Sequence, residues 1–330
     1  MNSFILSNFI LLILFSSLLM SDERFTNTNN MPNLKSFGDF LKWSFERKRP
    51  KPVAIESSDE WKGYADLKTN YLIWIGHSTF LINIDGTVIL TDPVFSNRAS
   101  PLKIAGPKRI IPPAMNIDDL PKIDVVTVSH NHYDHLDISS LKKLSAINPN
   151  TVFLVPKGDA KLLNRKGIKN TQEFLWWENT TIKGAKFTFT PTQHWSARGL
   201  ADRNKSLWGG WFMSFPNFKA YHAGDSGYSK DFLDTQAKLG SPDLSLIPIG
   251  AYAPSWFMKA NHVNPEEALQ VALDLGSKKT YAMHWGTFPL SDEETLEPPK
   301  LLEEALTKKS LPVDFFEILK PGQLKKVTLN

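Results

Sequence analysis

The segment from Val125 to Asp137 constrains the fold of this chain more than any other stretch. It begins with the apolar, β-branched run VVTV, which is typical of a buried strand, and then changes abruptly to SHNHYDHLD. Surface turns consist mainly of Gly, Asn, Asp and Ser, so three histidines and an aspartate after a strand indicate another purpose. Imidazole and carboxylate at this density suit a borderline cation such as zinc. We therefore predict a metal site at the end of this strand.

Side chains that alternate in direction along the loop would divide the candidate ligands into two pairs. His130 and His132 could hold one metal, while Asp134 and His135, pointing the other way, could hold a second. The chain has no cysteine, which excludes thiolate ligands, disulfides and cysteine nucleophiles. Any metal must therefore be held by His, Asp or Glu.

Three further strand-like runs also end in a possible ligand. KFTFT leads to His194, KAYHAG leads to Asp225, and KTYAM leads to His284. With the first loop they make seven candidates, and two metals need about seven or eight ligand positions when a carboxylate and a water are shared. Asp225 carries two oxygens in a glycine-flanked loop and is the natural bridge. His222 alternates within its strand-like run, and we expect it to be structural.

Three other polar residues lie in or beside these runs. Asp92 follows the run TVILT and could accept a hydrogen bond from a ligand histidine, although an Asp before a proline also initiates turns. His77, between two strand-like runs, is similarly ambiguous. The string GDSG at residues 224–227 matches the surroundings of a trypsin-like nucleophile, but the partner histidine and aspartate contexts are missing. We do not expect Ser226 to be a nucleophile.

The order of strand-like and helix-like runs predicts an α/β fold. Runs at 71–75, 79–84 and 87–91, joined by tight turns, predict an antiparallel start to a sheet. A helix is predicted from Asn264 to Leu275 by its Asn N-cap, its Pro in the first turn and the Glu three residues on. Residues 95–121 predict a long loop. This pattern suits a layered α/β sandwich whose strand ends form one rim.

The N-terminal part differs in composition from the rest. Residues 4–20 are nearly all apolar, a length between a signal-peptide core and a minimal membrane span, and the cations follow this stretch. We expect a hydrophobic signal or anchor segment over 1–24, a linker with an N-terminal helix over 25–62, and a compact domain over 63–330. The expected localisation is membrane-associated through the N-terminal segment, with an exported or a cytoplasm-facing domain left undecided.

The histidine-rich string carries a resemblance to a known family. HNHYDH at 130–135 is the His-x-His-x-Asp-His signature of the metallo-β-lactamase superfamily, and His194, Asp225 and His284 match its remaining ligand motifs in order. More narrowly, the chain resembles the N-acylphosphatidylethanolamine-hydrolysing phospholipase D family over roughly residues 64–322. The strings that carry this narrower resemblance include TDP at 91–93, GPKR at 106–109, QHW at 193–195, IPIGAY at 247–252, WFMK at 256–259, HWGTF at 284–288 and LEPP at 296–299.

The resemblance implies a metallo-β-lactamase αββα four-layer sandwich with two zinc ions. The implied ligands of the first zinc are His130, His132, His194 and Asp225. Those of the second are Asp134, His135, Asp225 and His284. The 63–330 segment would then be the catalytic domain.

The resemblance also implies further site residues. His262 would lie over the metals near the scissile phosphate and act in catalysis together with Asp225. We expect Asp92 and His77 to support the ligands. Asn261 stands where the mammalian enzymes have Gln. The expected substrate-binding residues are Tyr133, Trp256, Lys259 and Asn261.

The implied function is that of a dinuclear zinc phosphodiesterase of phospholipase D type. It would hydrolyse N-acylphosphatidylethanolamine-like phospholipids to N-acylethanolamine and phosphatidic acid with metal-activated hydroxide. Ten Trp and twenty-one Phe suit an apolar groove and a membrane boundary, so we expect a phospholipid substrate and a membrane surface as partners. A net charge of +4 without a basic stripe excludes a nucleic-acid partner. A homodimer is left open.

Two alternatives keep parts of this interpretation. A metal-dependent lactonase or small-ester hydrolase would have the same fold and another substrate. A catalytically silent, membrane lipid-binding protein would be free to lose ligands, whereas all seven candidates are present here.

Overall fold

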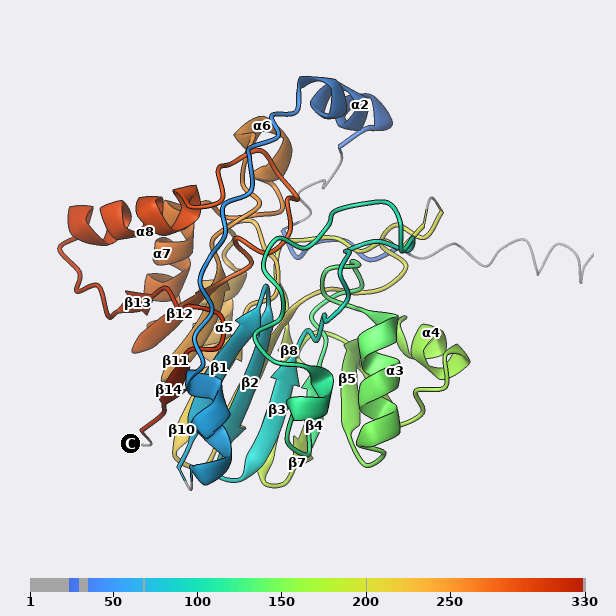
Figure 1. The fold of residues 1–330 in the computed structure, drawn as a ribbon, viewed down its shortest axis with the longest axis vertical. Helices are drawn as coiled ribbons and strands as arrows, with labels where there is room; N and C mark the ends of the chain where they lie inside the picture. Colours follow the sequence, from blue (N-terminus) through green and yellow to red (C-terminus); the bar gives the residue numbers. More distant parts are fainter. Residues whose placement is uncertain (1–23, 30–34, 68, 200, 329–330) are drawn as a thin grey trace, which may run out of the picture.

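The computed structural model describes residues 24–29, 35–67, 69–199 and 201–328, and two seven-stranded sheets form its centre (Figure 1). In spatial order the first sheet contains β14 (Leu324–Lys326), β1 (Tyr71–Gly76), β2 (Thr79–Ile84), β3 (Thr87–Thr91), β4 (Val125–Thr127), β5 (Val152–Pro156) and β6 (Thr171–Phe174). The second contains β13 (Phe316–Glu317), β12 (Lys279–Met283), β11 (Leu244–Pro248), β10 (Phe218–His222), β9 (Gly210–Phe215), β8 (Ala185–Thr190) and β7 (Asn179–Ile182).

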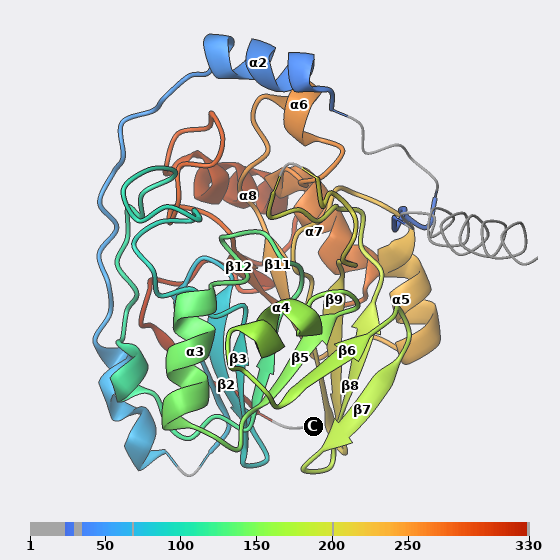
Figure 2. The ribbon, with the colours of Figure 1, turned by 90° about the vertical axis from the view of Figure 1, so that its right-hand side faces the viewer.

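Helices cover the outer face of each sheet, which gives the four layers of an αββα sandwich (Figures 1 and 2). Those packed on the first sheet are α3 (Ile138–Ile147) and α4 (Ala160–Arg165), and those on the second are α5 (Asp231–Leu239), α7 (Pro265–Asp274) and α8 (Glu297–Lys308). The remaining short elements are α2 (Phe37–Glu46), α6 (Ser255–Met258) and the 3-10 turns η1 (Glu60–Asp66) and η2 (Ile117–Asp119). The predicted αββα sandwich is confirmed.

Period-2 alternation in the first sheet builds both of its hydrophobic interfaces. Leu72 and Trp74 of β1 point into the core between the two sheets, while Ile73 and Ile75 join the layer beneath α3 and α4. All four side chains are buried, as expected for a strand with a layer on each face.

The predicted helix start at Asn264 is also confirmed, because Asn264 and Glu267 form a capping box at the beginning of α7.

The strand directions bring the important loops to one rim. In the first sheet β3 and β4 run parallel, and β1 has the same direction because two antiparallel pairings separate it from β3. In the second sheet β10, β11 and β12 are parallel, and β8 runs with β10 for the same reason. The loops that follow all these strands therefore emerge at equivalent ends.

The N-terminal helix α2 lies above this rim, next to α6 (Figure 1). Ser36 and Asp39 form its capping box, and the Trp43 ring stacks on Phe257 with 5.0 Å between ring centroids. The Trp43 indole N–H also donates to the carboxylate of Asp292 at 3.2 Å. These contacts hold α2 across the end of the sandwich where the loops converge.

No helix within the described ranges is long and apolar enough to cross a membrane. Of the predicted 1–24 segment, residues 1–23 lie outside the described residues. The boundaries proposed for that segment, for the linker region and for the catalytic domain stay predictions.

One buried carboxyl in the first sheet's helical layer gives a testable pH dependence. Asp159, just before α4, is only 1% exposed, and its Oδ1 accepts from the Asn131 amide at 3.0 Å. Burial raises its pKa to about 7. The folded state thus holds this proton more tightly than the unfolded chain, so the stability it contributes is complete below about pH 4 and is lost as the pH rises through about 7.

We therefore expect Asp159→Asn, which keeps the acceptor but carries no charge, to lose this dependence. Between pH 5 and pH 8 the variant should gain about 2–3 kcal/mol of unfolding free energy relative to the wild type. Urea unfolding of both proteins at the two pH values measures this difference. If the unfolding free energies of the variant and the wild type differ by the same amount at pH 5 and at pH 8, Asp159 ionises normally in the folded protein.

Candidate metal centre

All seven candidate ligands lie in loops at the rim where the strand ends meet. His130, His132, Asp134 and His135 follow β4, His194 follows β8, Asp225 follows β10 and His284 follows β12. The structure brings their ring nitrogens and carboxylate oxygens into two adjoining groups. His77 lies within 4.8 Å of Asp134, His135 and His284, and His262 lies within 4.8 Å of His194 and Asp225, so both histidines border these groups.

The first group consists of three imidazoles whose nitrogens face one another. His132 Nδ1 lies 2.9 Å from His130 Nε2 and 3.2 Å from His194 Nε2. His194 Nδ1 is 3.0 Å from the Asn261 carbonyl, which can only accept, so Nδ1 carries the proton and Nε2 presents a lone pair. This arrangement is that of a ligand histidine.

The second group combines two imidazoles with two carboxylates. His284 Nε2 lies 3.3 Å from Asp134 Oδ2 and 3.0 Å from Asp225 Oδ2. His135 Nε2 lies 3.4 Å and 3.1 Å from the same two oxygens. Each of the two imidazole nitrogens therefore faces both carboxylates.

Asp225 connects the two groups. Its Oδ2 also lies 3.8 Å from His130 Nε2 and 3.9 Å from His194 Nε2, so one oxygen borders both groups. Its Oδ1 is buried without a hydrogen-bond partner among the described residues. A buried polar atom without a partner is costly, so this oxygen suits a cation-binding site.

The spacing of the donor atoms fits metal coordination. In a tetrahedral zinc site with bonds of about 2.0–2.1 Å, neighbouring ligand atoms are about 3.3 Å apart. Neighbouring atoms here are 2.9 and 3.2 Å apart in the first group and 3.0 to 3.4 Å apart in the second. Nitrogen and oxygen donors of these kinds suit zinc and similar divalent ions.

Electrostatics favours positive charge at this site. Burial alone would raise the pKa of the Asp225 carboxyl, but the neighbouring His135 and His284 hold it well below its usual range. Burial opposes protonation of His284, yet Asp225 and Asp134 raise its pKa to about 9. A divalent cation would replace the protons that these carboxylates attract. In the first group, burial holds the pKa of His130 well below its usual range, which leaves the neutral form that binds metals.

Asp92 and His77 lie where they can orient ligands. Asp92 Oδ2 is 2.7 Å from His135 Nδ1, and the same carboxylate accepts from the backbone N–H and the hydroxyl of Ser129. His77 Nε2 is 3.1 Å from Asp134 Oδ2. A carboxylate that holds the far nitrogen of a ligand histidine fixes its tautomer and ring orientation. His222 is buried and lies 3.8 Å from Asp92, not among the ligand groups.

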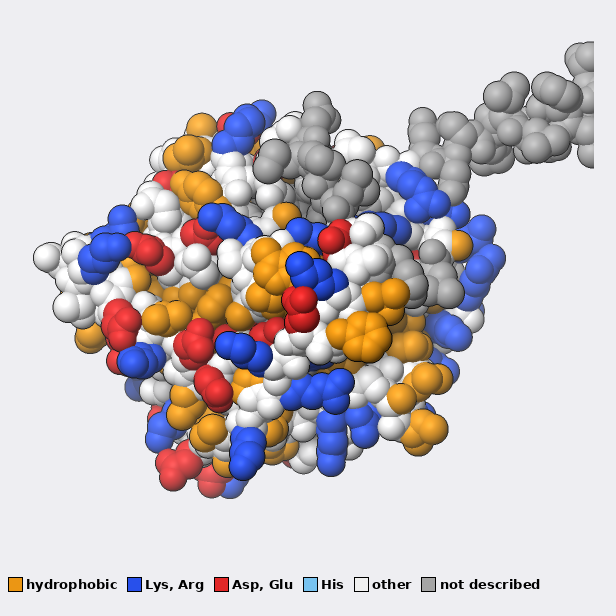
Figure 3. Space-filling model, turned by 90° about the horizontal axis from the view of Figure 1, so that it is seen from above, with side chains coloured by type: hydrophobic (Ala, Val, Ile, Leu, Met, Phe, Trp, Pro, Cys, Tyr) orange, Lys and Arg blue, Asp and Glu red, His pale blue; other side chains and the backbone are white. Residues whose placement is uncertain are grey.

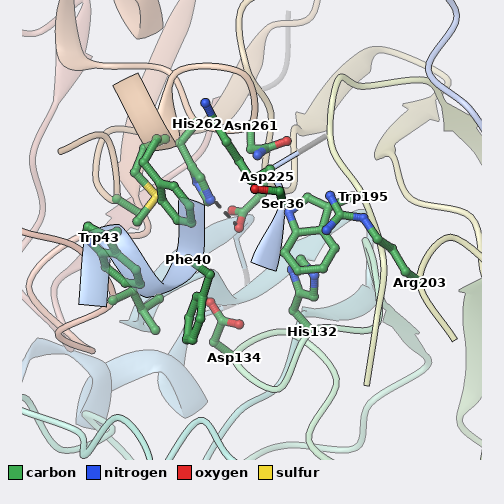
Figure 4. Close-up of a pocket in the computed structure, with 15 residues that line it drawn as sticks. Ser36, Phe40, Trp43, His132, Asp134, Trp195, Arg203, Asp225, Asn261 and His262 are labelled. Atoms are coloured by element: carbon green, nitrogen blue, oxygen red, sulfur yellow. Dashed lines mark ion pairs between the residues drawn. The ribbon is translucent and has the colours of Figure 1, made fainter. Parts of the chain in front are cut away.

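A cavity of about 460 Å³ opens over the two groups (Figure 4). His132, Asp134, Asp225 and His262 border it on the metal side, and His262 points toward Asp225. The residues of its apolar wall come from α2, α6 and the loop after β12: Phe40, Trp43, Phe257, Met258 and Leu290. The chemistry of the site thus lies at the bottom of a largely apolar cavity that α2 covers.

The four expected substrate-binding residues lie in different places. Asn261 is buried and lines the cavity. Tyr133 donates to the Arg198 carbonyl at 2.8 Å and packs in a separate small cluster with Phe288. Trp256 lies on the outer surface of α6, beneath the ammonium groups of two lysines, and Lys259 pairs with Glu267. Of the four, only Asn261 borders the cavity.

Several site residues were missed by the sequence analysis. Trp43 and Phe40 lie on α2, which is the N-terminal helix predicted within residues 25–62, but neither was predicted to line the site. Lys35 and Arg203 line the cavity too, but nothing in the sequence distinguishes them from other surface cations. Trp195 packs edge-on against His132 with 4.3 Å between ring centroids.

Comparisons with known proteins agree on the family. A sequence profile of the beta-lactamase superfamily domain matches residues 87–285. The chain is 40% identical over 267 residues to N-acyl-phosphatidylethanolamine-hydrolyzing phospholipase D 1 of Caenorhabditis elegans, covering 77% of this chain and 74% of that protein. It is 40% identical to the mitochondrial N-acyl-phosphatidylethanolamine-hydrolyzing phospholipase D of Saccharomyces cerevisiae, over 76% of this chain and 54% of that one. A metallo hydrolase of Ignicoccus hospitalis shares the fold, with a TM-score of 0.60 and 20% identity over 80% of this chain and 100% of the other.

These findings correct the predicted localisation. Membrane association through the N-terminal segment, with an exported or cytoplasm-facing domain, was expected. The yeast relative is named as a mitochondrial protein, and no membrane-crossing helix is found in the described part of the chain. An apolar stretch followed by cations does not specify the cellular compartment of a protein, because targeting signals of several kinds contain such a stretch. The localisation prediction is therefore contradicted.

The fold, the signature and the relatives support the same assignment. The profile spans the segment from β3 to His284, which includes all seven candidate ligands. The relatives extend the similarity to about three quarters of the chain at 40% identity. The chain is a metal-dependent hydrolase that belongs to the metallo-β-lactamase superfamily and, within it, to the N-acylphosphatidylethanolamine-hydrolysing phospholipase D family.

Proposed function

We propose that this protein is a dinuclear zinc phosphodiesterase of phospholipase D type. It hydrolyses N-acylphosphatidylethanolamine-like phospholipids to N-acylethanolamine and phosphatidic acid. The observation that carries the proposal is the pair of donor groups, with neighbouring atoms 2.9 to 3.4 Å apart, at the bottom of an apolar cavity. The relatives' names, which specify this reaction, support the substrate class.

In this proposal the seven rim residues would hold two zinc ions, and Asp225 would contribute to both sites. His130, His132, His194 and Asp225 would hold the first ion. Asp134, His135, Asp225 and His284 would hold the second. When bound, the ions would lower the pKa of a water molecule toward about 7 and neutralise charge on the phosphoryl oxygens.

The chain's own residues perform the remaining tasks. Asp92 holds His135 in the tautomer that presents Nε2. His262 borders the cavity above Asp225 and donates a hydrogen bond to the leaving oxygen. The aromatic and aliphatic wall of the cavity excludes water and accepts acyl chains.

The cations of the cavity favour an anionic substrate over a neutral lactone. Lys35 and Arg203 both line it, and the Arg203 guanidinium lies 4.4 Å from the centre of the Trp195 ring. Positive charge at the mouth of an apolar cavity attracts a phosphodiester and offers nothing to an uncharged ester.

A lipid surface is the proposed site of substrate delivery. Figure 3, which looks down on the α2 end, shows hydrophobic side chains with Lys and Arg side chains among them. Phe45 is 88% exposed, and Phe40, Leu41 and Trp256 are also exposed near Lys42. Exposed aromatic rings beside cations suit an interface with anionic lipid. A homodimer stays a prediction.

The experiment that tests the function is hydrolysis of defined lipids before and after metal removal. We expect purified protein to release N-acylethanolamine from N-acylphosphatidylethanolamine vesicles, as measured by mass spectrometry. A chelator should abolish the release, and zinc should restore it, because the proposed ions activate the water.

Soluble lactones and small esters serve as the comparison substrates in the same assay. Faster turnover of a lactone than of the phospholipid would assign the protein to the alternative hydrolase class. Full phospholipid hydrolysis by protein that contains no metal would contradict the proposed mechanism.

A further inference from the structure

Residues 24–29, of which 25–29 were expected to lie in a linker, are packed onto the loop that carries His194. Figure 2 shows this short blue segment between two grey traces, beside α5. The Phe25 backbone N–H donates to the Asn204 carbonyl at 2.8 Å, and the Thr28 hydroxyl donates to Asp231 Oδ1 at 2.6 Å. The segment is therefore fixed at both ends to the body of the domain.

Asn27 forms the central contact of this segment. Its side chain belongs to a residue that is only 4% exposed, and its Oδ1 accepts from the His194 backbone N–H at 3.1 Å. The same oxygen accepts from the Trp208 indole N–H, also at 3.1 Å. One amide oxygen thus joins the two ends of the loop between β8 and β9, close to His194.

A second set of hydrogen bonds extends from Asn29 toward His262. Asn29 Nδ2 donates to Gln193 Oε1 at 2.7 Å, and Gln193 Nε2 donates to the Ala260 carbonyl at 2.8 Å. The next carbonyl, that of Asn261, accepts from His194 Nδ1. His194 is therefore held from two sides, with its backbone bonded to the segment and its ring bonded to the loop before His262.

We propose that Asn27 is a positioning residue for the metal site, which fixes the backbone of His194 so that Nε2 faces His132 and Asp225. This inference rests on the proposed function, because it assumes that His194 is a metal ligand. Partners that orient ligand side chains typically contribute 10- to 100-fold in metal affinity or activity. A buried donor that loses its acceptor also costs stability, so the loop would move to satisfy the His194 N–H elsewhere.

The test compares substitutions within the segment in the full-length protein. Asn27→Leu has a similar size and no acceptor, whereas Asn27→Asp retains an oxygen that can accept both bonds. Thr28→Val is the matched control, because it removes a bond of the same segment to α5 and none to His194. The readouts are the zinc dissociation constant by chelator competition, the melting temperature of metal-free protein, and kcat and KM with and without excess zinc.

We expect Asn27→Leu to weaken zinc binding about 10-fold or more, and excess zinc to restore much of kcat with little change in KM. Asn27→Asp should bind zinc more tightly than Asn27→Leu, and Thr28→Val should bind it as the wild type does. Equal zinc affinities of Asn27→Leu and the wild type would overturn the inference. Equal losses in Asn27→Leu and Thr28→Val would also overturn it, because the segment would then act only through general stability.

His194→Ala separates this inference from the function on which it rests. If His194→Ala binds zinc as the wild type does, the proposed ligand set is wrong. If His194→Ala loses zinc while Asn27→Leu retains it, the ligand set stands and the role of Asn27 is excluded.

Discussion

Asp225→Asn is expected to lose most of its bound zinc and to lower kcat/KM on the order of 10³-fold or more, since in the proposed site this carboxylate would contribute to both ions. Its Oδ2 borders both donor groups, at 3.0 Å from His284 and 3.8 Å from His130. The amide has nearly the same shape, so the change removes mainly the negative charge. Metal analysis of the purified variant and its rate of N-acylethanolamine release measure the effect.

Asp124→Asn provides the matched control for this change. Asp124 is a carboxylate just before β4, and its Oδ2 accepts from the Val88 backbone N–H and from Lys183. It lies at the opposite end of β4 from the His130 loop, so zinc content and turnover should remain near those of the wild type. An Asp225→Asn protein that holds two zinc ions and works at the normal rate would rule out a shared carboxylate at this position.

The strand ends explain how candidate ligands far apart in the sequence could be predicted to lie close together. Each apolar run could be recognised by its β-branched and aromatic residues, and each ended at a polar side chain such as His194 or His284. Within each sheet these strands run in the same direction, and the residues that follow them meet at one rim. A local pattern therefore predicted a long-range convergence, because parallel strands of one sheet end at the same edge.

The walls of the cavity could not be predicted in the same way. Trp256 and Tyr133 belong to strings shared with the family, yet Trp256 faces outward and Tyr133 bonds to the Arg198 carbonyl. Side-chain direction on short helices and irregular loops depends on tertiary packing, which no local period reveals. Asn27 is a clearer case, because a single Asn in a polar stretch has no sequence signal for a buried role.

Substitution of His262 tests whether the leaving oxygen needs a hydrogen-bond donor. It lies in the loop between α6 and α7, and its Nδ1, 3.9 Å from Asp225 Oδ2, has no hydrogen-bond partner among the described residues. Burial lowers the pKa of His262 to about 4, so the imidazole is neutral at physiological pH and still offers an N–H. A donor placed at the cavity wall is suited to bond an oxygen that gains negative charge.

We expect His262→Ala to lower kcat about 10²- to 10⁴-fold while zinc content stays unchanged, a range typical for loss of a group that assists proton transfer. His262→Gln keeps a donor and should retain part of the rate. The informative comparison uses a phosphodiester with a nitrophenolate leaving group, which departs as a stable anion and needs no donor. The loss for His262→Ala should then be much smaller than with N-acylphosphatidylethanolamine. Equal losses on both substrates would show that His262 acts elsewhere in the reaction, and an unchanged rate would exclude it from catalysis.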